Sequence, residues 1–347
     1  MFKIILIIAL IPLLYVVGNI VFAILTKFSP APIETVAVEG SGSNAPIADS
    51  TLTFMTWNVG YGGLGAETDF FYDDGKMVIT PKNLVEKYTH GIFSFMKENK
   101  TTDFILLQEV DRKGKRSYDI DEYKNIATNL PDHATAFALN YDVKNLPFPW
   151  TEPLGRIYGG LMSASRFKPT DSKRYALSGI TDFPKKLFYL ERCLLVQKFP
   201  LQNGKELVVV NTHFEAYDDG GIKKQQMAET KKIVLAEYAK GNYVVIGGDW
   251  NIAPPSFNVK KWEKEKNTDV LYELKNDPDY IAGWQYAFDG NTPSNRKNNH
   301  AFNENTFTTV IDYFYVSPNI EIVAVNGVDA GFKFSDHNPV KMTIKLK

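Results

Sequence analysis

The chain has 347 residues, of which 44% are hydrophobic and 13% aromatic, enough apolar material for one large domain or two modest ones. Its 39 Lys and Arg residues nearly cancel its 40 Asp and Glu residues, giving a formal net charge of −1. A neutral total argues against non-specific polyanion binding as the main function, although it is compatible with a local basic groove. The single cysteine, Cys193, excludes an intramolecular disulfide and a cysteine-based zinc site, and its apolar surroundings predict a buried, inert thiol.

The N-terminus is predicted to be a membrane anchor. Residues 4–25 read IILIIALIPLLYVVGNIVFAIL, about 22 residues without a charge, which is long enough to cross a bilayer as a helix. A cleaved signal peptide is the alternative, but the stretch exceeds an ordinary signal core and no Ala-x-Ala site follows promptly. The amino terminus and Lys3 outweigh Lys27 slightly, which favours a body outside the cytoplasm. We therefore expect a single-pass membrane protein anchored by residues 1–28, with an extracytoplasmic body.

The rest of the chain divides into a linker and one globular body. Residues 29–50 are rich in Pro, Gly, Ser and Ala, which predicts a flexible linker before a body at 51–347. Strands outnumber helices in the body, which predicts an α/β (α+β) architecture of two packed sheets flanked by helices. In chain order, the predicted elements are a strand at 51–59, an amphipathic helix at 81–99, a strand buried on both faces at 103–110, paired strands at 192–199 and 205–214, a helix at 222–240 ended by Gly241, a buried strand at 242–251, and strands at 309–317 and 341–347.

Polar side chains stand at the ends of most of these apolar strands. They are Asn58, Glu109, Asn211, His213, Asp249, Asn251 and Asp312, with Asp336 and His337 just before the last strand. Each alone has an ordinary explanation as a turn, capping, loop or core residue. However, a carboxylate in a strongly apolar strand is costly unless it is paired or binds a metal, and this cost recurs at Glu109, Asp249 and Asp312. Because strand ends converge on one edge of a sheet, these groups could share a pocket. Oxygen ligands with no Cys and few His suit Mg²⁺, Mn²⁺ or Ca²⁺ better than zinc.

Six short motifs carry these residues in a fixed order between Thr56 and Val340. They are TWNVGYG, LLQEVD, VVVNTHF, VIGGDWNIAP, IDYFYVS and SDHNPV. Together they resemble the motifs of the endonuclease/exonuclease/phosphatase superfamily, the DNase I-like fold. YGGLMSASRF (residues 158–167) and LERCLLV, which contains Arg192, resemble two further strands of that family. The resemblance implies a four-layer sandwich in which two packed, mostly antiparallel β-sheets are flanked by helices.

The resemblance also implies a role for each residue in the in-line attack of water on a phosphoester. Asp312 would orient His337 and keep it cationic, and Asp249 would orient or deprotonate the water. His213 would be a second acid–base or phosphate-binding imidazole, so which histidine is the acid and which the base stays open. By role, the metal residues would be Asn58, Glu109 and Asp336, the catalytic residues His213, Asp249, Asn251, Asp312 and His337, and the phosphate-binding residues Arg192 and Asn211.

The expected function is therefore a membrane-anchored, divalent-metal-dependent phosphoesterase that hydrolyses phosphodiester bonds, with Mg²⁺ as the metal and Mn²⁺ or Ca²⁺ as alternatives. The substrate, a nucleic acid or a phospholipid or its head group, stays undecided, although the absence of a pronounced basic run does not favour tight binding of duplex DNA. Residues 140–160, rich in aromatic residues, Pro and Gly, fit a substrate-facing loop or an ordinary surface loop. The chain is expected to act as a monomer. The alternative function is a catalytically inactive binding or scaffold protein on the same fold.

Overall fold

The computed structural model describes residues 2–218, 220–264 and 275–347, with side chains from residue 10 onward. The helices are α1 (Phe2–Thr26), α2 (Lys82–Glu98), α3 (Glu122–Asn129) and α4 (Gly221–Tyr238), with short 3₁₀ turns η1 (Gly60–Gly62), η2 (Phe71–Asp73) and η3 (Lys185–Leu187). The strands are β1 (Ile33–Thr35), β2 (Val38–Gly40), β3 (Thr51–Asn58), β4 (Phe104–Gly114), β5 (Ala134–Leu146), β6 (Gly155–Ser165), β7 (Asp171–Ala176), β8 (Cys193–Pro200), β9 (Glu206–His213), β10 (Tyr243–Asp249), β11 (Gln285–Ala287), β12 (Asn295–Arg296), β13 (Thr308–Thr309), β14 (Asp312–Val316), β15 (Ile320–Gly327) and β16 (Val340–Leu346).

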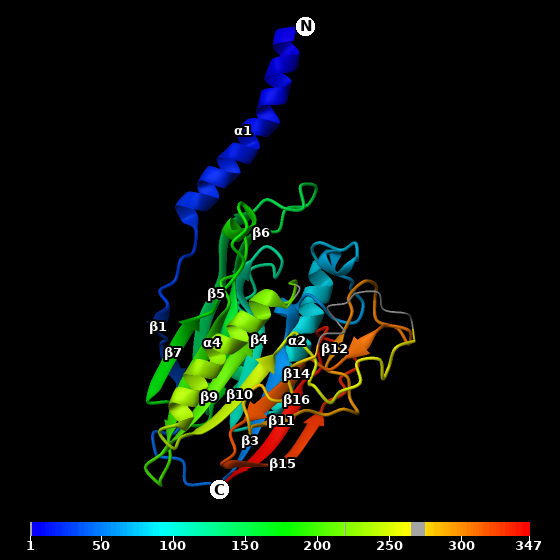
Figure 1. The fold of residues 1–347 in the computed structure, drawn as a ribbon. Coiled ribbons are helices and arrows are strands. Elements are labelled where there is room, and N and C mark those ends of the chain that lie inside the picture. The colour runs from blue at the N-terminus through cyan, green and yellow to red at the C-terminus, as the bar shows by residue number, and fades with distance from the viewer. Residues whose placement is uncertain (1, 219, 265–274) are drawn as a thin grey trace.

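Two seven-stranded sheets form the centre of the protein (Figure 1). The first has the order β1-β7-β8-β9-β10-β14-β11 and the second the order β15-β16-β3-β4-β6-β5-β2. Among the described strands of these sheets, neighbours run antiparallel except for the parallel pairs β9–β10 and β3–β4. The expected pair of packed, mostly antiparallel sheets is therefore confirmed, with a small β12–β13 ribbon beside them.

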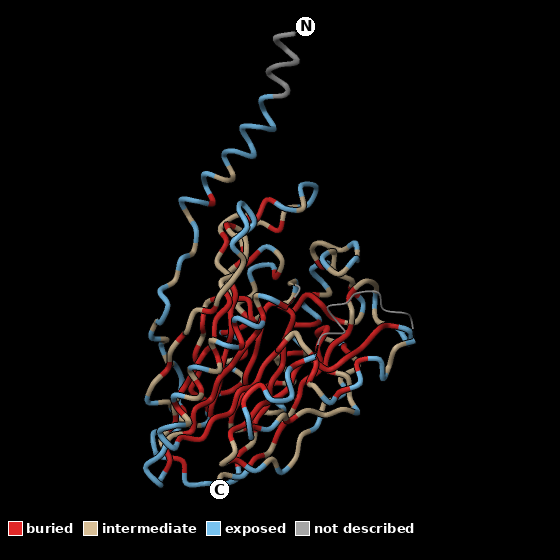
Figure 2. Tube along the Cα trace, in the orientation of Figure 1, coloured by how far each residue is buried: buried red, intermediate tan, exposed pale blue. Residues whose placement is uncertain are grey.

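The sheets pack face to face and helices cover their outer faces. Phe54 on one sheet and Phe314 on the other meet edge to face, with ring centroids 6.1 Å apart, in the core between the sheets. On the outer side of the first sheet, Val210 belongs to a cluster with Val234 of α4. The second sheet packs in the same way against α2 and α3. Buried residues accordingly occupy the middle of the body (Figure 2). The order of the layers is helices, sheet, sheet, helices (α/β/β/α).

The sequence pattern explains why the central strands take these positions. In β4, Leu106 faces the core between the sheets, while Ile105 and Leu107 face α2 and α3. Successive side chains of a strand point to opposite faces, so a continuous apolar run is what a strand covered on both sides requires. The strand predicted at 103–110 is thus present and continues to Gly114. The helix predicted at 222–240 ends sooner, at Tyr238.

Residues 29–50 do not form the predicted flexible linker. β1 pairs with β7 at the edge of the first sheet, and β2 pairs with β5 at the edge of the second. Ile47 is buried in the core between the sheets, and its N–H donates to Pro200 O at 2.8 Å. The linker prediction was wrong because Val36, Val38 and Ile47 supply apolar contacts that the Pro, Gly and Ser content of the segment obscured.

The predicted anchor at 1–28 corresponds to α1, with Met1 outside the described residues. Within the part of the chain that the structure describes, no helix combines the length and the mean hydropathy that crossing a bilayer requires. The described part of α1 contacts the body near the loop that follows β5. The ring of Tyr15 lies 6.1 Å from that of Trp150, and Asn145 Nδ2 donates to Asn19 Oδ1 at 2.9 Å.

Candidate active site

Strand register brings three of the predicted site residues together at one end of the first sheet. β10 runs parallel to β9 with Asp249 opposite His213, and antiparallel to β14 with Asp249 opposite Asp312. Asp249 and Asp312 are almost completely buried, and His213 is 6% exposed. These three side chains therefore lie together at this end of the sheet with little exposure to solvent.

The second sheet contributes Asn58 and Glu109 to the same place. Asn58 ends β3, and Glu109 lies where the register of β4 against β6 shifts, in a left-handed conformation with φ of 54°. Such strained bulges commonly re-aim a side chain beside a functional site. Asn58 Nδ2 donates to Glu109 Oε1 and to Asp249 Oδ2, both at 3.0 Å, while Asn58 Oδ1 accepts from Gly60 N. In this arrangement Asn58 orients two carboxylates and ties the two sheets together.

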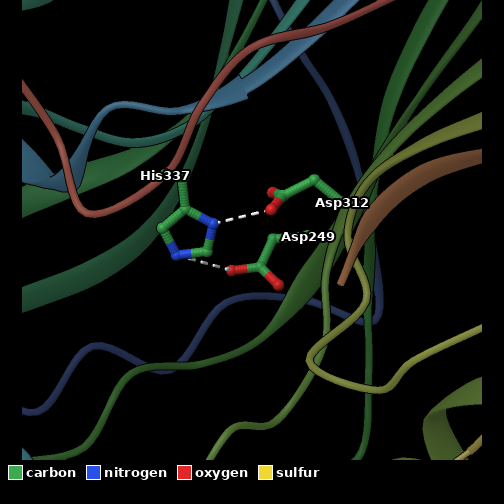
Figure 3. Close-up of side chains that lie close together, drawn as sticks. All are labelled: Asp249, Asp312 and His337. Atoms are coloured by element: carbon green, nitrogen blue, oxygen red, sulfur yellow. Dashed lines mark hydrogen bonds and ion pairs between the residues drawn. The ribbon is translucent and has the colours of Figure 1, made fainter. Parts of the chain in front are cut away.

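His337 lies between two carboxylates (Figure 3). Its Nδ1 donates to Asp312 Oδ2 at 2.7 Å, and its Nε2 is 3.7 Å from Asp249 Oδ2. Burial alone would lower the pKa of His337, but the negative charges of Asp312, Asp336 and Asp249 outweigh it and raise the pKa well above 6.5. The imidazole is therefore a cation at neutral pH, held in one orientation by Asp312.

His213 has the opposite protonation state. Its Nε2 lies 3.4 Å from Asp249 Oδ2 and 4.0 Å from Glu109 Oε1. Burial, with the positive charges of Arg192 and His337, lowers the pKa of His213 well below 6.5. This imidazole is therefore neutral at neutral pH.

Asp249 connects the two histidines. Burial raises the pKa of Asp249 to about 6, so that the carboxyl group is ionised at neutral pH but close to its midpoint. Its Oδ1 accepts the N–H of Asn251 at 2.9 Å. Asn251 has a left-handed backbone (φ of 48°), and its Nδ2 donates to Phe214 O at 3.0 Å. Asp249 is thus a fixed carboxylate placed to accept a proton.

Two groups of side chains could hold a metal ion. The ligand atoms of Asp249, Asp312 and His337 lie within 4.8 Å of one another. The 2.7 Å hydrogen bond between His337 Nδ1 and Asp312 Oδ2, however, already uses one candidate ligand atom of each of these two residues. Glu109 and Asp336 are the better pair, because both line one cavity. Burial raises the pKa of Glu109, and the negative charge of Asp336 raises it further. A cation held by both would relieve that repulsion, and carboxylate oxygens are the donors that hard divalent cations prefer, so these residues fit such an ion.

A cavity of about 570 Å³ opens over these groups. Asn58 and Asp312 are buried behind it, in contact with residues that reach it. The predicted site residues in its lining are Glu109, Arg192, His213, Asp249, Asn251, Asp336 and His337. Most of the predicted set thus surrounds one space large enough for a substrate.

Asn211 is the exception. It is fully buried away from the cavity lining, and its Nδ2 donates to Met162 O at 2.9 Å and Leu107 O at 3.1 Å. Its Oδ1 accepts from Gln108 Nε2 at 2.8 Å. The predicted phosphate-binding role has no support in this geometry, because every polar atom of the side chain is used to join β9 to β4 and β6.

Sequence reasoning missed three polar residues at the site. Arg116 lines the cavity, is paired with Asp111 through two hydrogen bonds of 2.8 and 3.0 Å, and lies 3.8 Å from the ring centre of Tyr61. The side-chain amide of Asn295 lies 3.0 Å from His337 Nε2, and Asn298 Nδ2 donates to Asp336 Oδ2. None of the three ends an apolar strand. The only signal was the run of amides in SNRKNNH (residues 294–300).

The fold and the site define an α/β sandwich with a buried acid–base cluster where the strands of both sheets end. A family model described as "Endonuclease/Exonuclease/phosphatase family" matches residues 55–337. The chain belongs to this family.

Solved structures agree at the level of the fold. An endonuclease/exonuclease/phosphatase from Beutenbergia cavernae is 19% identical, with a TM-score of 0.56 over 86% of this chain and 72% of that one. The human Nocturnin catalytic domain, solved with a bound sulfate, is 13% identical, with a TM-score of 0.52 over 90% and 97%. A mannosyl-6-phosphatase from Bacteroides thetaiotaomicron is 14% identical, with a TM-score of 0.50 over 84% and 99%. No curated protein matches the chain.

Proposed function

We propose that the protein is a divalent-metal-dependent phosphoesterase that hydrolyses phosphodiester bonds by in-line attack of water. The observation that carries the proposal is the convergence of the two histidines and Asp249 with Glu109 and Asp336 on one cavity. The cation of His337 and the neutral imidazole of His213 flank the carboxylate of Asp249. Family membership supports the reaction class. Phosphoester hydrolysis requires both charge neutralisation and proton transfer, and the charged and titratable groups around the cavity can supply both.

Glu109 and Asp336 would hold the cation, with Asn58 orienting Glu109. Mg²⁺ is the first choice, and Mn²⁺ or Ca²⁺ the alternatives. When bound, the ion would neutralise charge that develops on the phosphate oxygens. Arg192 lines the same cavity and would add a positive charge for the phosphate.

Proton transfer falls to the residues around Asp249. Asp249 would orient the attacking water and take its proton, and the neutral His213 beside it would contact the phosphate. His337, cationic and fixed by Asp312, would bind the phosphate or donate a proton to the leaving oxygen. This proposal thus gives the base role to Asp249 and the acid or phosphate-binding role to His337.

Hydrolysis of a substrate panel with and without EDTA tests this proposal. The panel contains plasmid DNA, single-stranded DNA, RNA, sphingomyelin, a phosphoinositide and bis-4-nitrophenyl phosphate. We expect EDTA-sensitive hydrolysis of at least one phosphodiester, restored by added Mg²⁺. If purified, folded protein hydrolyses none of them in Mg²⁺, Mn²⁺ or Ca²⁺, the scaffold alternative takes its place.

Membrane attachment rests on the uncharged sequence of residues 4–25, and the extracytoplasmic location rests on the charges of the amino terminus and Lys3 against Lys27. Carbonate extraction and protease protection of intact cells test both. Release of the protein by carbonate would exclude a spanning anchor.

A further inference from the structure

The cavity continues from the acid–base cluster into a region walled by aromatic rings. Leu146, Leu154 and Ile157 lie among these rings in the cavity wall. We call this region the aromatic arm, and its rings are Phe70, Tyr72, Tyr141, Phe148, Phe188 and Tyr217. Glu109 and Asp336 stand in the lining of the same cavity, so one molecule could occupy both regions.

The wall of the arm is built from segments that are distant in the sequence but touch one another. The ring of Tyr72 lies 5.5 Å from Phe70 and 6.0 Å from Tyr217. Phe71 joins this group to Phe148, with centroids 6.2 Å apart. Tyr72, Phe148 and Tyr217 are nevertheless each more than 40% exposed. Aromatic surface packed on its sides and open toward a cavity is the ordinary lining of a site for an apolar ligand group.

Three tyrosine hydroxyls in this region already have partners within the protein. Tyr141 Oη donates to Phe188 O at 3.1 Å, and Tyr217 Oη donates to Asp73 Oδ1 at 3.1 Å. Tyr189, which also lines the cavity, donates to Glu215 Oε1 at 2.6 Å. Because protein acceptors occupy these hydroxyls, the faces of their rings are the surface left for a ligand. Ring faces favour a substituent that needs no hydrogen-bond partner, whereas a nucleobase also needs donors and acceptors for its edge.

We propose that the aromatic arm binds a large apolar group of the phosphoester substrate, an alkyl, acyl or aryl substituent, while the phosphate lies over Glu109 and Asp336. The inference rests on the proposed function and adds the class of substrate. Burial of the substituent against the rings would supply binding free energy in proportion to its apolar area.

A series of diesters with a common leaving group measures this preference. The esters are methyl, hexyl and benzyl 4-nitrophenyl phosphate and thymidine 5′-(4-nitrophenyl phosphate), all releasing 4-nitrophenolate. We expect kcat/KM for the hexyl or the benzyl ester to exceed that for the methyl ester by on the order of tenfold. The comparison of hexyl with benzyl distinguishes a chain from a ring. The thymidine ester should be slower than the better of these two.

Phe148→Ala should lower the ratio of kcat/KM between the preferred ester and the methyl ester by about threefold or more. The matched control is Phe183→Ala, because Phe183 is 60% exposed and stands outside the cavity lining. This control should keep the wild-type ratio.

The outcomes separate the two proposals. Equal kcat/KM for the methyl, hexyl and benzyl esters overturns the apolar substrate class while the proposed hydrolysis stands. Fastest turnover of the thymidine ester overturns it in favour of a nucleotide. A Phe148→Ala variant with the wild-type ratio overturns the placement in the arm. No EDTA-sensitive turnover of any ester contradicts the proposed function itself.

Discussion

At the scale of single residues, the site depends on two histidines whose surroundings drive their pKa values apart. His337 is surrounded by Asp312, Asp336 and Asp249, whereas His213 lies near the positive charges of Arg192 and His337. Both histidines stand next to polar residues in the sequence, so the sequence did not distinguish them. The difference arises from charges that the fold brings together, and environments that separate two titratable groups commonly mark acid and base roles.

Alanine substitutions test the central residues. Glu109→Ala, Asp249→Ala and His337→Ala should each reduce EDTA-sensitive kcat by about a thousandfold or more, because each removes charge neutralisation or proton transfer. Circular dichroism should show each variant folded. Glu98→Ala and His90→Ala, at exposed positions of α2, are the matched controls and should keep full activity. Full activity in any of the three variants would contradict the role given to that residue.

A histidine outside the site should make stability depend on pH. His133 is buried, its Nε2 donates to Thr102 O at 2.9 Å, and its Nδ1 has no partner. Burial lowers the pKa of His133 below 6.5, so below that pH the unfolded chain binds a proton that the folded protein does not. The free energy of unfolding therefore falls as pH falls.

Urea unfolding at pH 7.5 and 5.5 measures this effect. His133→Gln should lose less stability between the two pH values than the wild type. Equal losses in the two proteins would show that His133 titrates alike in the folded and unfolded chain.

At the scale of elements, apolar periodicity predicted the strands that carry the site, but composition misled at residues 29–50. The strands predicted at 51–59 and 242–251 are β3 and β10, because buried strands need continuous apolar runs. β1 and β2 are three residues each, too short for a periodic signal, and their pairing depends on edges that β7 and β5 leave open. Arg116 lies in a turn after β4, where apolar periodicity gives no information, and so the sequence did not mark it as a site residue.

Substitutions at two isoleucines of the 29–50 segment distinguish a packed segment from a linker. Ile47→Ala should lower the free energy of unfolding by about 2–4 kcal/mol, because Ile47 is 3% exposed and its removal leaves a cavity between the sheets. Ile33→Ala is the matched control, since Ile33 is 54% exposed, and should change stability by less than about 0.5 kcal/mol. If both substitutions change the free energy of unfolding in denaturant by the same small amount, the segment behaves as the predicted flexible linker.

At the scale of the whole molecule, the site exists only where the two sheets are held in register with each other. Asn58 and Glu109 come from the second sheet, and Asp249 and Asp312 come from the first. The order of the motifs was visible in the sequence. The way in which the motifs come together in space was not visible in the sequence, because it depends on polar contacts between the sheets, such as the one from Asn58 to Asp249. Asn211, which the sequence suggested for phosphate binding, makes another such contact below the cavity.

Asn211→Ala should therefore affect stability more than catalysis. The substitution removes hydrogen bonds to Leu107 O, Met162 O and Gln108 Nε2 in a fully buried place, and should lower the free energy of unfolding by about 2–4 kcal/mol. Asn305→Ala, at an exposed loop position, is the matched control and should change stability by less than about 0.5 kcal/mol. Under conditions where both variants are folded, KM for a phosphodiester should stay near the wild-type value. A raised KM with an unchanged free energy of unfolding would instead support the predicted phosphate-binding role of Asn211, because a residue that only joins the sheets does not contact substrate.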